Sequence, residues 1–438
     1  MSVPVPVPVG SGSIAPARPE GGLATRRAAM GWIAGGLGAL STPLRAAGPL
    51  AGQHVRVAFI DPLSGPAGPI GRSGLRTWQF MARALAGEGN PAGVRMTVAG
   101  FDNKGSPQES LNALKAAIDQ GFRYIVQGNG SGVASVIVDA VERHNLRFPD
   151  RAVLYINYAA MDPALTQEQC SYWHVRIDAD TAMKTQALAR HLASQAGLER
   201  VYLLNQNYAH GQQVATYFQS ALKQVAPHIR VVGEELFPAF QEQDFAPYVN
   251  RAIAARAQAL VTGNWGEDLQ GLARSMIEQR AETPLYAYYP SLQGMPTTLA
   301  HPDRRFEVYQ VACGHTSQPG PLRQLGQAYR RETGEDLVVY AAYDGVSMLI
   351  HAMRFAESID AARVAARISG MLFKGFNGPV QVDPFDHQLQ KGVYISHWQK
   401  VSATYPVAAE GTGFTFAPVR YFEAGQLSTP SRCRMRRP

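Results

Sequence analysis

A helix, a strand and a glycine-rich turn follow one another in the stretch SPQESLNALKAAIDQGFRYIVQGNGSG, residues 106–132. Ser106 can cap the start of the helix, and Glu109 completes a capping box with it. Gly121 ends the helix, and the β-rich run Tyr124–Gln127 follows. Short β-rich runs and amphipathic helical runs alternate in the same way on both sides of this stretch. The pattern predicts an α/β protein with parallel sheets covered by helices.

The alternation predicts a long series of strand–helix units. The predicted strands are His54–Ile60, Val94–Phe101, Tyr124–Gln127, Val153–Asn157, Val201–Asn205, Arg230–Leu236, Ala259–Thr262 and Leu285–Tyr288. The helices predicted between them are Gly74–Ala86, Pro107–Gln120, Val133–His144, Thr181–Ser194, Gln212–Val225, Phe245–Ala257 and Asp268–Gln279. Later segments predict a helix at Tyr340–Glu357 and strands at Phe306–Ala312, Pro379–Val382 and Val393–Gln399. A series of this length divides into two sheets, and we place the break near Trp173–Asp180.

Composition indicates a globular protein of two domains. The chain has 438 residues, of which 46% are hydrophobic and 17% charged, and its formal net charge is +7. The excess charge lies in the two ends, because residues 1–47 hold four arginines against one acid and residues 432–437 hold four more against none. The body between them is balanced. A nucleic-acid-binding protein would carry a basic stripe in its folded body, so that class is excluded.

Residues 1–47 have the pattern of an export signal. A start rich in proline and glycine leads to the pair Arg26-Arg27, then to an apolar run over Ala28–Leu40 and small residues at Ala46-Ala47. The paired arginines favour the twin-arginine route, and the run is shorter than the ~20 residues that span a bilayer. We therefore expect cleavage, export to the periplasm and a soluble mature protein.

Sequence motifs for catalysis are missing. The glycine-rich turn fails the dinucleotide fingerprint at Val133, and there is no Walker lysine motif, nucleophile elbow or HExxH. Cys170, Cys313 and Cys433 offer no CxxC pair for zinc. One disulfide among them is compatible with an oxidising compartment, and its pairing stays open. We expect a protein that is not an enzyme and that needs no cofactor or metal.

The turn Gly128–Val133 has the equipment to hold an anion. Its glycines free the backbone to turn, so that N–H groups can point into a cleft beside the start of a helix. Ser131 adds a hydroxyl, and a carboxylate is a natural ligand for such a turn. The alternative is a plain loop between a strand and a helix.

Further polar and aromatic residues follow other predicted strands. In a parallel sheet these strand ends meet at one edge, where ligands of open α/β sheets bind. Aromatic side chains at such an edge suit the wall of a small-molecule pocket. The segments concerned are Asn157–Pro163, Asn207–Gly211, Gly263–Asp268 and Tyr286–Tyr289.

These segments resemble the type I periplasmic binding proteins that serve branched-chain amino-acid ABC transporters, the leucine/isoleucine/valine-binding-protein family. The resemblance runs from about Val55 to Gln399. It is carried by the order and spacing of four motifs: Ala58–Pro66 with its Ser-Gly turn, Phe101–Gln108, Asn157–Thr166 and Tyr208–Gln212. The resemblance implies two Rossmann-like lobes with parallel-sheet cores, joined by a three-strand hinge, that close over ligand like a Venus flytrap.

The family's site residues carry over to specific positions of this chain. The resemblance implies that Ser131, with Gly132 and the nearby backbone, holds the ligand carboxylate together with main-chain atoms of Ala159 and Met161. Aromatic positions on the closing lobe match Tyr208 and Trp265.

Two departures from the family pattern bear on the ligand. Amino-acid binders hold the ligand ammonium with an acid from the second lobe, and the approximate match here is Tyr289, although Asp268 or Glu267 could substitute. A buried ammonium without such a partner is costly, which raises an aromatic or aliphatic carboxylate without an amino group as an alternative ligand. Gly105 and Gly130 stand where family members often carry a cysteine pair.

The sequence thus predicts a periplasmic, monomeric solute-binding protein of an ABC importer, which captures a branched-chain-like amino acid or a related small carboxylate and passes it to a membrane permease. A ligand-sensing receptor module for a signalling partner is the alternative. The predicted division is an export signal at 1–47, a first lobe at 53–177 plus 315–378, a second lobe at 178–314 plus 379–425, and a disordered Arg-rich tail at 426–438.

Overall fold

The structure is a computed structural model, and it describes residues 48–315, 320–427 and 429–438. The predicted export signal lies outside the described residues. None of the helices within these ranges combines the length and the apolar character that a crossing of the bilayer requires.

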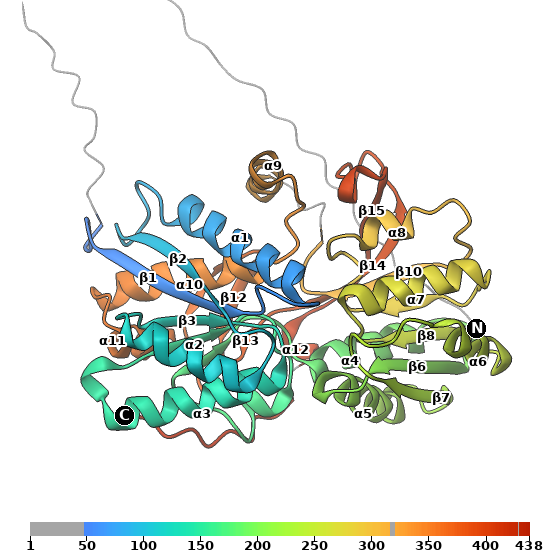
Figure 1. Ribbon diagram of the computed structural model, residues 1–438, viewed down its shortest axis with the longest axis horizontal. Coiled ribbons are helices and arrows are strands. Elements are labelled where there is room, and N and C mark those ends of the chain that lie inside the picture. The colour runs from blue at the N-terminus through green and yellow to red at the C-terminus, as the bar shows by residue number, and fades with distance from the viewer. Residues whose placement is uncertain (1–47, 316–319, 428) are drawn as a thin grey trace, which may run out of the picture. The chain divides into compact units, whose positions relative to one another are not determined.

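Five parallel strands form the sheet of the first lobe, in the order β2-β1-β3-β4-β5. The strands are β1 (His54–Asp61), β2 (Arg95–Asp102), β3 (Tyr124–Gln127), β4 (Leu154–Asn157) and β5 (His174–Arg176). The helices packed with them are α1 (Gly68–Leu85), α2 (Pro107–Asp119), α3 (Ser131–Arg147), α10 (Ala341–Ala356) and α11 (Ala361–Ile368). Short 3₁₀ turns lie at η1 (Pro149–Arg151) and η2 (Pro163–Thr166). Figure 1 shows these elements together in blue, teal and orange.

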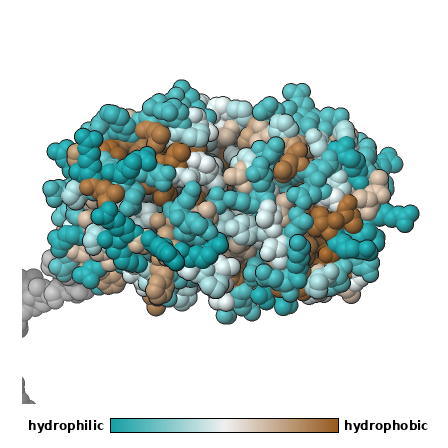
Figure 2. Space-filling model, turned by 90° about the horizontal axis from the view of Figure 1, so that it is seen from below, coloured by the Kyte–Doolittle hydropathy of each residue, from teal (hydrophilic) through white to brown (hydrophobic). Residues whose placement is uncertain are grey.

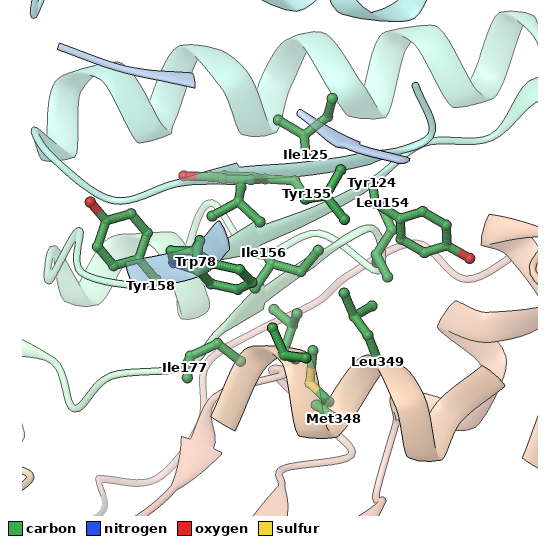
Figure 3. Packing of buried hydrophobic residues seen from close by; sticks show 14 of the residues in the cluster. Trp78, Tyr124, Ile125, Leu154, Tyr155, Ile156, Tyr158, Ile177, Met348 and Leu349 are labelled. Atoms are coloured by element: carbon green, nitrogen blue, oxygen red, sulfur yellow. The ribbon is translucent and has the colours of Figure 1, made fainter. Parts of the chain in front are cut away.

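The first lobe buries both faces of its sheet. Every residue of β3 and β4 is buried, as a parallel sheet with helices on both sides requires. Figure 3 shows Met348 and Leu349 of α10 on one side of β4, the strand that carries Leu154 and Ile156. The late helix α10 therefore completes a core that the first third of the chain begins.

Seven strands form the sheet of the second lobe, in the order β15-β14-β10-β9-β8-β6-β7. They are β6 (Arg200–Gln206), β7 (Arg230–Phe237), β8 (Ala259–Thr262), β9 (Leu285–Ala287), β10 (Val308–Ala312), β14 (Val393–Lys400) and β15 (Phe414–Phe422). The first five are parallel, and β14 and β15 add an antiparallel edge. The accompanying helices are α4 (Thr181–Ala193), α5 (Ala209–Val225), α6 (Ala246–Ala254), α7 (Gly266–Glu278), α8 (Met295–Leu299) and α12 (Ala424–Leu427), with a 3₁₀ turn at η3 (Ala409–Gly411).

The remaining elements are α9 (Pro321–Thr333) and a small antiparallel sheet of β11 (Leu372–Gly375), β12 (Gly378–Val382) and β13 (Leu389–Gln390). The predicted fold class, two lobes with parallel-sheet cores, is confirmed. The predicted break at Trp173–Asp180 contains the short strand β5, which three residues of pattern could not reveal. Ser106 caps α2 as predicted, but its own N–H donates to Asn103 O, so no capping box closes there.

A buried guanidinium binds the two crossings between lobes that lie within the described ranges. Arg176, at the end of β5, is fully buried, and its side chain donates to Gln388 Oε1 at 2.5 Å and Asp180 Oδ2 at 3.0 Å. Gln388, on the returning chain, donates to Asp178 O at 2.9 Å. The lobe boundaries stay a prediction. Val382 and Leu389, which the prediction assigns to the second lobe, belong to the core cluster of the first lobe.

The sequence predicts a disordered Arg-rich tail at 426–438, but within residues 429–438 the structure shows specific contacts with the first lobe. Cys433 forms a disulfide with Cys170 of the first lobe, while Cys313 is free and buried. Arg432 N donates to Gln167 Oε1 at 2.7 Å, and the Arg437 guanidinium donates to Ser369 Oγ at 3.3 Å. Sequence composition could not reveal these contacts, because the disulfide pairs Cys433 with a cysteine 263 residues away.

The tail also crosses from one lobe to the other. It leaves the second lobe at α12, which packs on α4, and it ends on the first lobe at the disulfide. The disulfide therefore adds a covalent link between the lobes to the main-chain crossings.

Polar residues predominate on the face shown in Figure 2, where hydrophobic residues form separate patches among them.

Replacing Cys433 by Ser should lower the free energy of unfolding by about 2–4 kcal/mol, because the unfolded chain gains the freedom of a long open loop. Denaturant unfolding of the oxidised protein measures this loss. Cys170→Ser and the double variant should lose the same amount, since all three remove one bond. An unchanged denaturation midpoint would show that the disulfide does not constrain the chain.

Candidate functional site

Each parallel sheet has one place where the order of winding reverses. In the first lobe this place lies between β1 and β3, and in the second lobe between β6 and β8. The connections at the carboxyl ends of such strands leave on opposite faces of the sheet, so a crevice opens between them. The segments that follow these four strands therefore border the two crevices and are candidates for a binding site.

At the first reversal, the carboxylate of Asp61 organises the glycine-rich turn. Asp61 ends β1 and is fully buried. Its Oδ1 accepts a hydrogen bond from Asn129 N at 3.0 Å, and its Oδ2 accepts from Asn129 Nδ2 at 3.0 Å and from Tyr158 OH at 2.5 Å. Gly128 is required by close approach, because a Cβ there would lie 2.6 Å from the Tyr158 ring. A buried hydrogen-bond network centred on Asp61 therefore fixes the conformation of the turn.

At the second reversal, two asparagine side chains hold the strand ends together. Asn205 Oδ1 accepts a hydrogen bond from Gly263 N at 2.7 Å, and Asn264 Oδ1 accepts from Gln206 N at 2.8 Å. The indole Nε1 of Trp265 then donates to Tyr208 OH at 2.8 Å. Two aromatic side chains from neighbouring strand ends therefore form one rigid wall.

Residues from both reversals line a single cavity. The first lobe contributes two main-chain segments, and the second lobe contributes mostly aromatic side chains. The lining residues are 128–131, 159–161, Tyr208, His210, Trp265, Tyr289 and Leu292. Among them there is no acidic side chain.

Three helices begin at this cavity without a side-chain cap. The N-cap residues are Gly130 for α3, Tyr208 for α5 and Trp265 for α7, and none of them makes a capping hydrogen bond through its side chain. Ordinary N-caps carry Ser, Thr, Asp or Asn, whose oxygen accepts from the free N–H groups of the first turn. Gly130 has a φ of 95°, which favours glycine at this position. Each helix N-terminus contributes a partial positive charge, which Glu267 and Asp268 oppose in the first turn of α7.

The structure brings together six of the eight predicted site residues around this cavity: Ser131, Ala159, Met161, Tyr208, Trp265 and Tyr289. Gly132 lies in the first turn of α3 but does not line the cavity.

The two acids suggested as substitutes at the second lobe lie elsewhere. Glu267 is exposed. Asp268 is buried and accepts hydrogen bonds from Gln206 Nε2 at 2.6 Å and Phe240 N at 2.8 Å, and it does not line the cavity. Both residues follow Gly266 at the start of α7, and only the direction of that helix shows that their side chains turn away.

Six lining residues were not predicted individually: Gly128, Asn129, Gly130, Ala160, His210 and Leu292. All of them except Leu292 belong to the turn and the strand-end segments that the sequence did single out, so only their individual roles were missed. Leu292 follows the tyrosines after β9 in a loop without a pattern, so no sequence signal pointed to it.

The titratable lining residues are uncharged at neutral pH. Burial, together with the nearby Lys184 ammonium, lowers the pKa of His210 to about 3. Burial raises the pKa of Tyr208 and Tyr289 well above the usual value. The cavity therefore offers hydroxyl groups, aromatic faces and main-chain N–H groups rather than charged side chains.

A second cavity continues from the first. The two share Asn129, Ala159, Tyr289 and Leu292 as lining residues. The second cavity also reaches the interlobe crossings, where it is lined by Asp178, Lys184, Cys313 and Lys391. A ligand whose head group lies in the first cavity can extend into the second.

Comparison with known proteins places the chain among binding proteins. The family model "Periplasmic binding protein" matches residues 54–403. The chain is 27% identical over 424 residues to "Leu/Ile/Val-binding protein homolog 4" of Brucella abortus. The alignment covers 93% of this chain and 99% of that relative.

Solved structures give the same result. The closed form of the leucine-, isoleucine-, valine-, threonine- and alanine-binding protein from Brucella ovis has a TM-score of 0.76 and 25% identity, and the alignment covers 88% of this chain and 100% of that one. An ABC-transporter solute-binding protein of R. palustris in complex with 4-hydroxybenzoate has a TM-score of 0.69 and 18% identity, covering 85% and 97% of the two chains. This second likeness concerns the fold alone.

Because the Asp61 carboxyl that holds the glycine-rich turn is buried, we expect the stability of the protein to depend on pH. Burial raises the pKa of Asp61 from 3.8 to about 7, against the opposing effect of its hydrogen bonds from Tyr158, Asn129 and Gly128. At pH values between about 4 and 7, the Asp61 carboxyl binds a proton in the folded chain and releases it in the unfolded chain. Asp61 therefore contributes stability that is fully present below about pH 4 and is lost as the pH rises to about 7.

Asp61→Asn removes this titration. The difference in unfolding free energy between wild type and variant should shrink from pH 4 to pH 7, by at most roughly 4 kcal/mol at about 1.4 kcal/mol per pH unit, and then stay constant. Denaturant unfolding at several pH values measures this difference. Parallel curves for the two proteins across this window would contradict the assignment.

Proposed function

This chain belongs to the periplasmic binding protein family, and from that membership we propose that it is the substrate-binding component of an ABC importer, which captures a small carboxylate between its lobes and delivers it to a membrane permease. Proteins of this family bind small molecules and are not enzymes. The ligand is then held without turnover, and closure of the hinge over it presents the loaded form to the permease.

The observation that carries this proposal is the convergence of three uncapped helix N-termini on a cavity without acidic lining residues. The N–H groups of Ser131, Gly132 and Val133 have no partner within α3, because the first intrahelical bond is Ala134 N to Gly130 O at 3.0 Å. They are available to a ligand carboxylate. The Ser131 side chain is buried at the same end of the helix and can add a hydroxyl donor.

We place the ligand carboxylate against the first lobe, as in the sequence prediction, and the rest of the ligand between the aromatic wall and the second cavity. Trp265 packs edge-on against Phe240 with ring centroids 4.8 Å apart and donates to Tyr208. These contacts position the two rings without a ligand, and such preorganisation reduces the entropy lost on binding.

Among carboxylates, the lining favours those without an amino group. A buried ammonium needs a carboxylate or several acceptors around it, and the first cavity has no acidic lining residue. An aromatic or aliphatic monocarboxylate fits this lining. A branched-chain-like amino acid is the second candidate, and the 27% identity to a Leu/Ile/Val-binding protein homolog over nearly the whole chain favours it.

A thermal-shift screen of the mature protein with amino acids and simple carboxylates tests the function. A ligand at about a thousand times its Kd adds roughly 4 kcal/mol to the stability of the folded state, so the midpoint should rise by several degrees. Calorimetry of each hit should give one site per chain and no product. If no small carboxylate raises the midpoint at millimolar concentration, the proposed function is wrong.

Ser131→Ala should weaken binding of the hit by about 1–2 kcal/mol, since one hydrogen bond to a charged group is lost. This corresponds to roughly a ten-fold rise in Kd by calorimetry. Ser135→Ala is the matched control, because Ser135 lies on the same helix and donates to the exposed Gln169 instead. Equal affinities for the two variants would remove the Ser131 hydroxyl from the site.

A further inference from the structure

An ion pair belonging to the chain itself stands beside the proposed carboxylate site. Lys184 Nζ lies 2.7 Å from Asp178 Oδ2. The side chain of Lys184 is only 3% exposed, while that of Asp178 is 19% exposed and lines the second cavity. The two residues flank the first crossing between the lobes, where the chain passes from β5 to α4.

The ammonium of Lys184 lies against two residues that line the first cavity. Its Nζ is 2.9 Å from Met161 Sδ and 5.9 Å from the centre of the Tyr289 ring. Met161 and Tyr289 both line the first cavity. An α-amino acid carries its ammonium one carbon away from its carboxylate, so a ligand ammonium would have to enter this same neighbourhood.

Asp178 is already supplied with donors and positive charge. Burial raises its pKa, but the ammonium groups of Lys184 and Lys391 and hydrogen bonds from Lys184 and Cys313 outweigh that effect and lower it. Lys391 in turn lies 2.6 Å from Asp344 Oδ2. The four charged side chains Asp178, Lys184, Asp344 and Lys391 thus balance one another without any ligand.

We propose that Lys184 supplies from within the chain the ammonium that an amino acid would otherwise bring, and that it is the residue that selects carboxylates without an amino group. This inference rests on the proposed function. A ligand ammonium would meet Lys184 at short range and would find Asp178 engaged. A monocarboxylate leaves the four charges balanced and places only apolar or neutral groups near Lys184.

The test compares ligands that differ only in the amino group: leucine with 4-methylpentanoate, and phenylalanine with 3-phenylpropanoate. Calorimetry on the mature, oxidised protein gives a Kd for each. The wild type should bind the acid without the amino group at least ten-fold more tightly in each pair. Lys184→Met should raise the relative affinity for the amino acid at least ten-fold, because the Asp178 carboxylate becomes available to the ligand ammonium.

The double variant Lys184→Met with Asp178→Asn is the matched control. It removes both charges, so the gain for amino acids should disappear. Circular dichroism and thermal melting check that each variant folds. If Lys184→Met does not fold, Lys184→Gln carries the same test, because its neutral side chain fills the space of Lys184 without bringing a charge.

Two failures can be told apart. A ratio that stays within two-fold of wild type in the folded Lys184 variant, or a wild type that binds leucine more tightly than 4-methylpentanoate, overturns the role of Lys184 and leaves the carboxylate site standing. A wild type that binds no member of either pair, nor any other carboxylate of the screen, overturns the proposed function and this inference with it.

Discussion

Parallel strands end at the same edge of a sheet, and the site of this protein depends on that constraint applied twice. Each sheet reverses its winding next to its first strand, between β1 and β3 in one lobe and between β6 and β8 in the other. At each reversal the neighbouring connections leave on opposite faces and cannot fill the space between them. The chain fixes the rims of both crevices with buried polar side chains, Asp61 in the first lobe and Asn205 and Asn264 in the second.

The electrostatics of the cavity follow from where the helices start. Glycine and aromatic residues occupy the N-cap positions of α3, α5 and α7, where a polar side chain would otherwise satisfy the free N–H groups. The helices therefore lack the stabilisation of a cap, and their positive ends stay available to an anion. Beside the second cavity, Asp178 pairs with Lys184 and Asp344 pairs with Lys391, so the charges cancel within each pair. The helix N-termini thus lie at one end of this space and the ion pairs at the other, and the proposal of a monocarboxylate ligand rests on this arrangement.

The links between the lobes combine buried charge with a covalent bond. Arg176 is paired with Asp180 and bonded to Gln388 of the returning chain, so two crossings are held as one unit. A buried guanidinium is stable only with such a full set of acceptors. The disulfide between Cys170 and Cys433 adds a further connection through the C-terminal tail. The disulfide therefore restricts the relative motion of the lobes, in addition to the restriction by the main-chain crossings.

Local pattern was enough to predict most strands and helices, the glycine-rich turn and the strand-end aromatic residues, because hydrophobic period and turn chemistry are properties of neighbouring residues. The parallel arrangement then implied that Ser131, Ala159, Tyr208 and Trp265 would lie at sheet edges. Tertiary structure alone decided the rest. Cys433 pairs across 263 residues, Asp268 turns into the protein to meet Gln206, and Lys184 meets Asp178 beside Met161. These contacts depend on the direction of a side chain and on which distant segments pack together, and no local pattern records either.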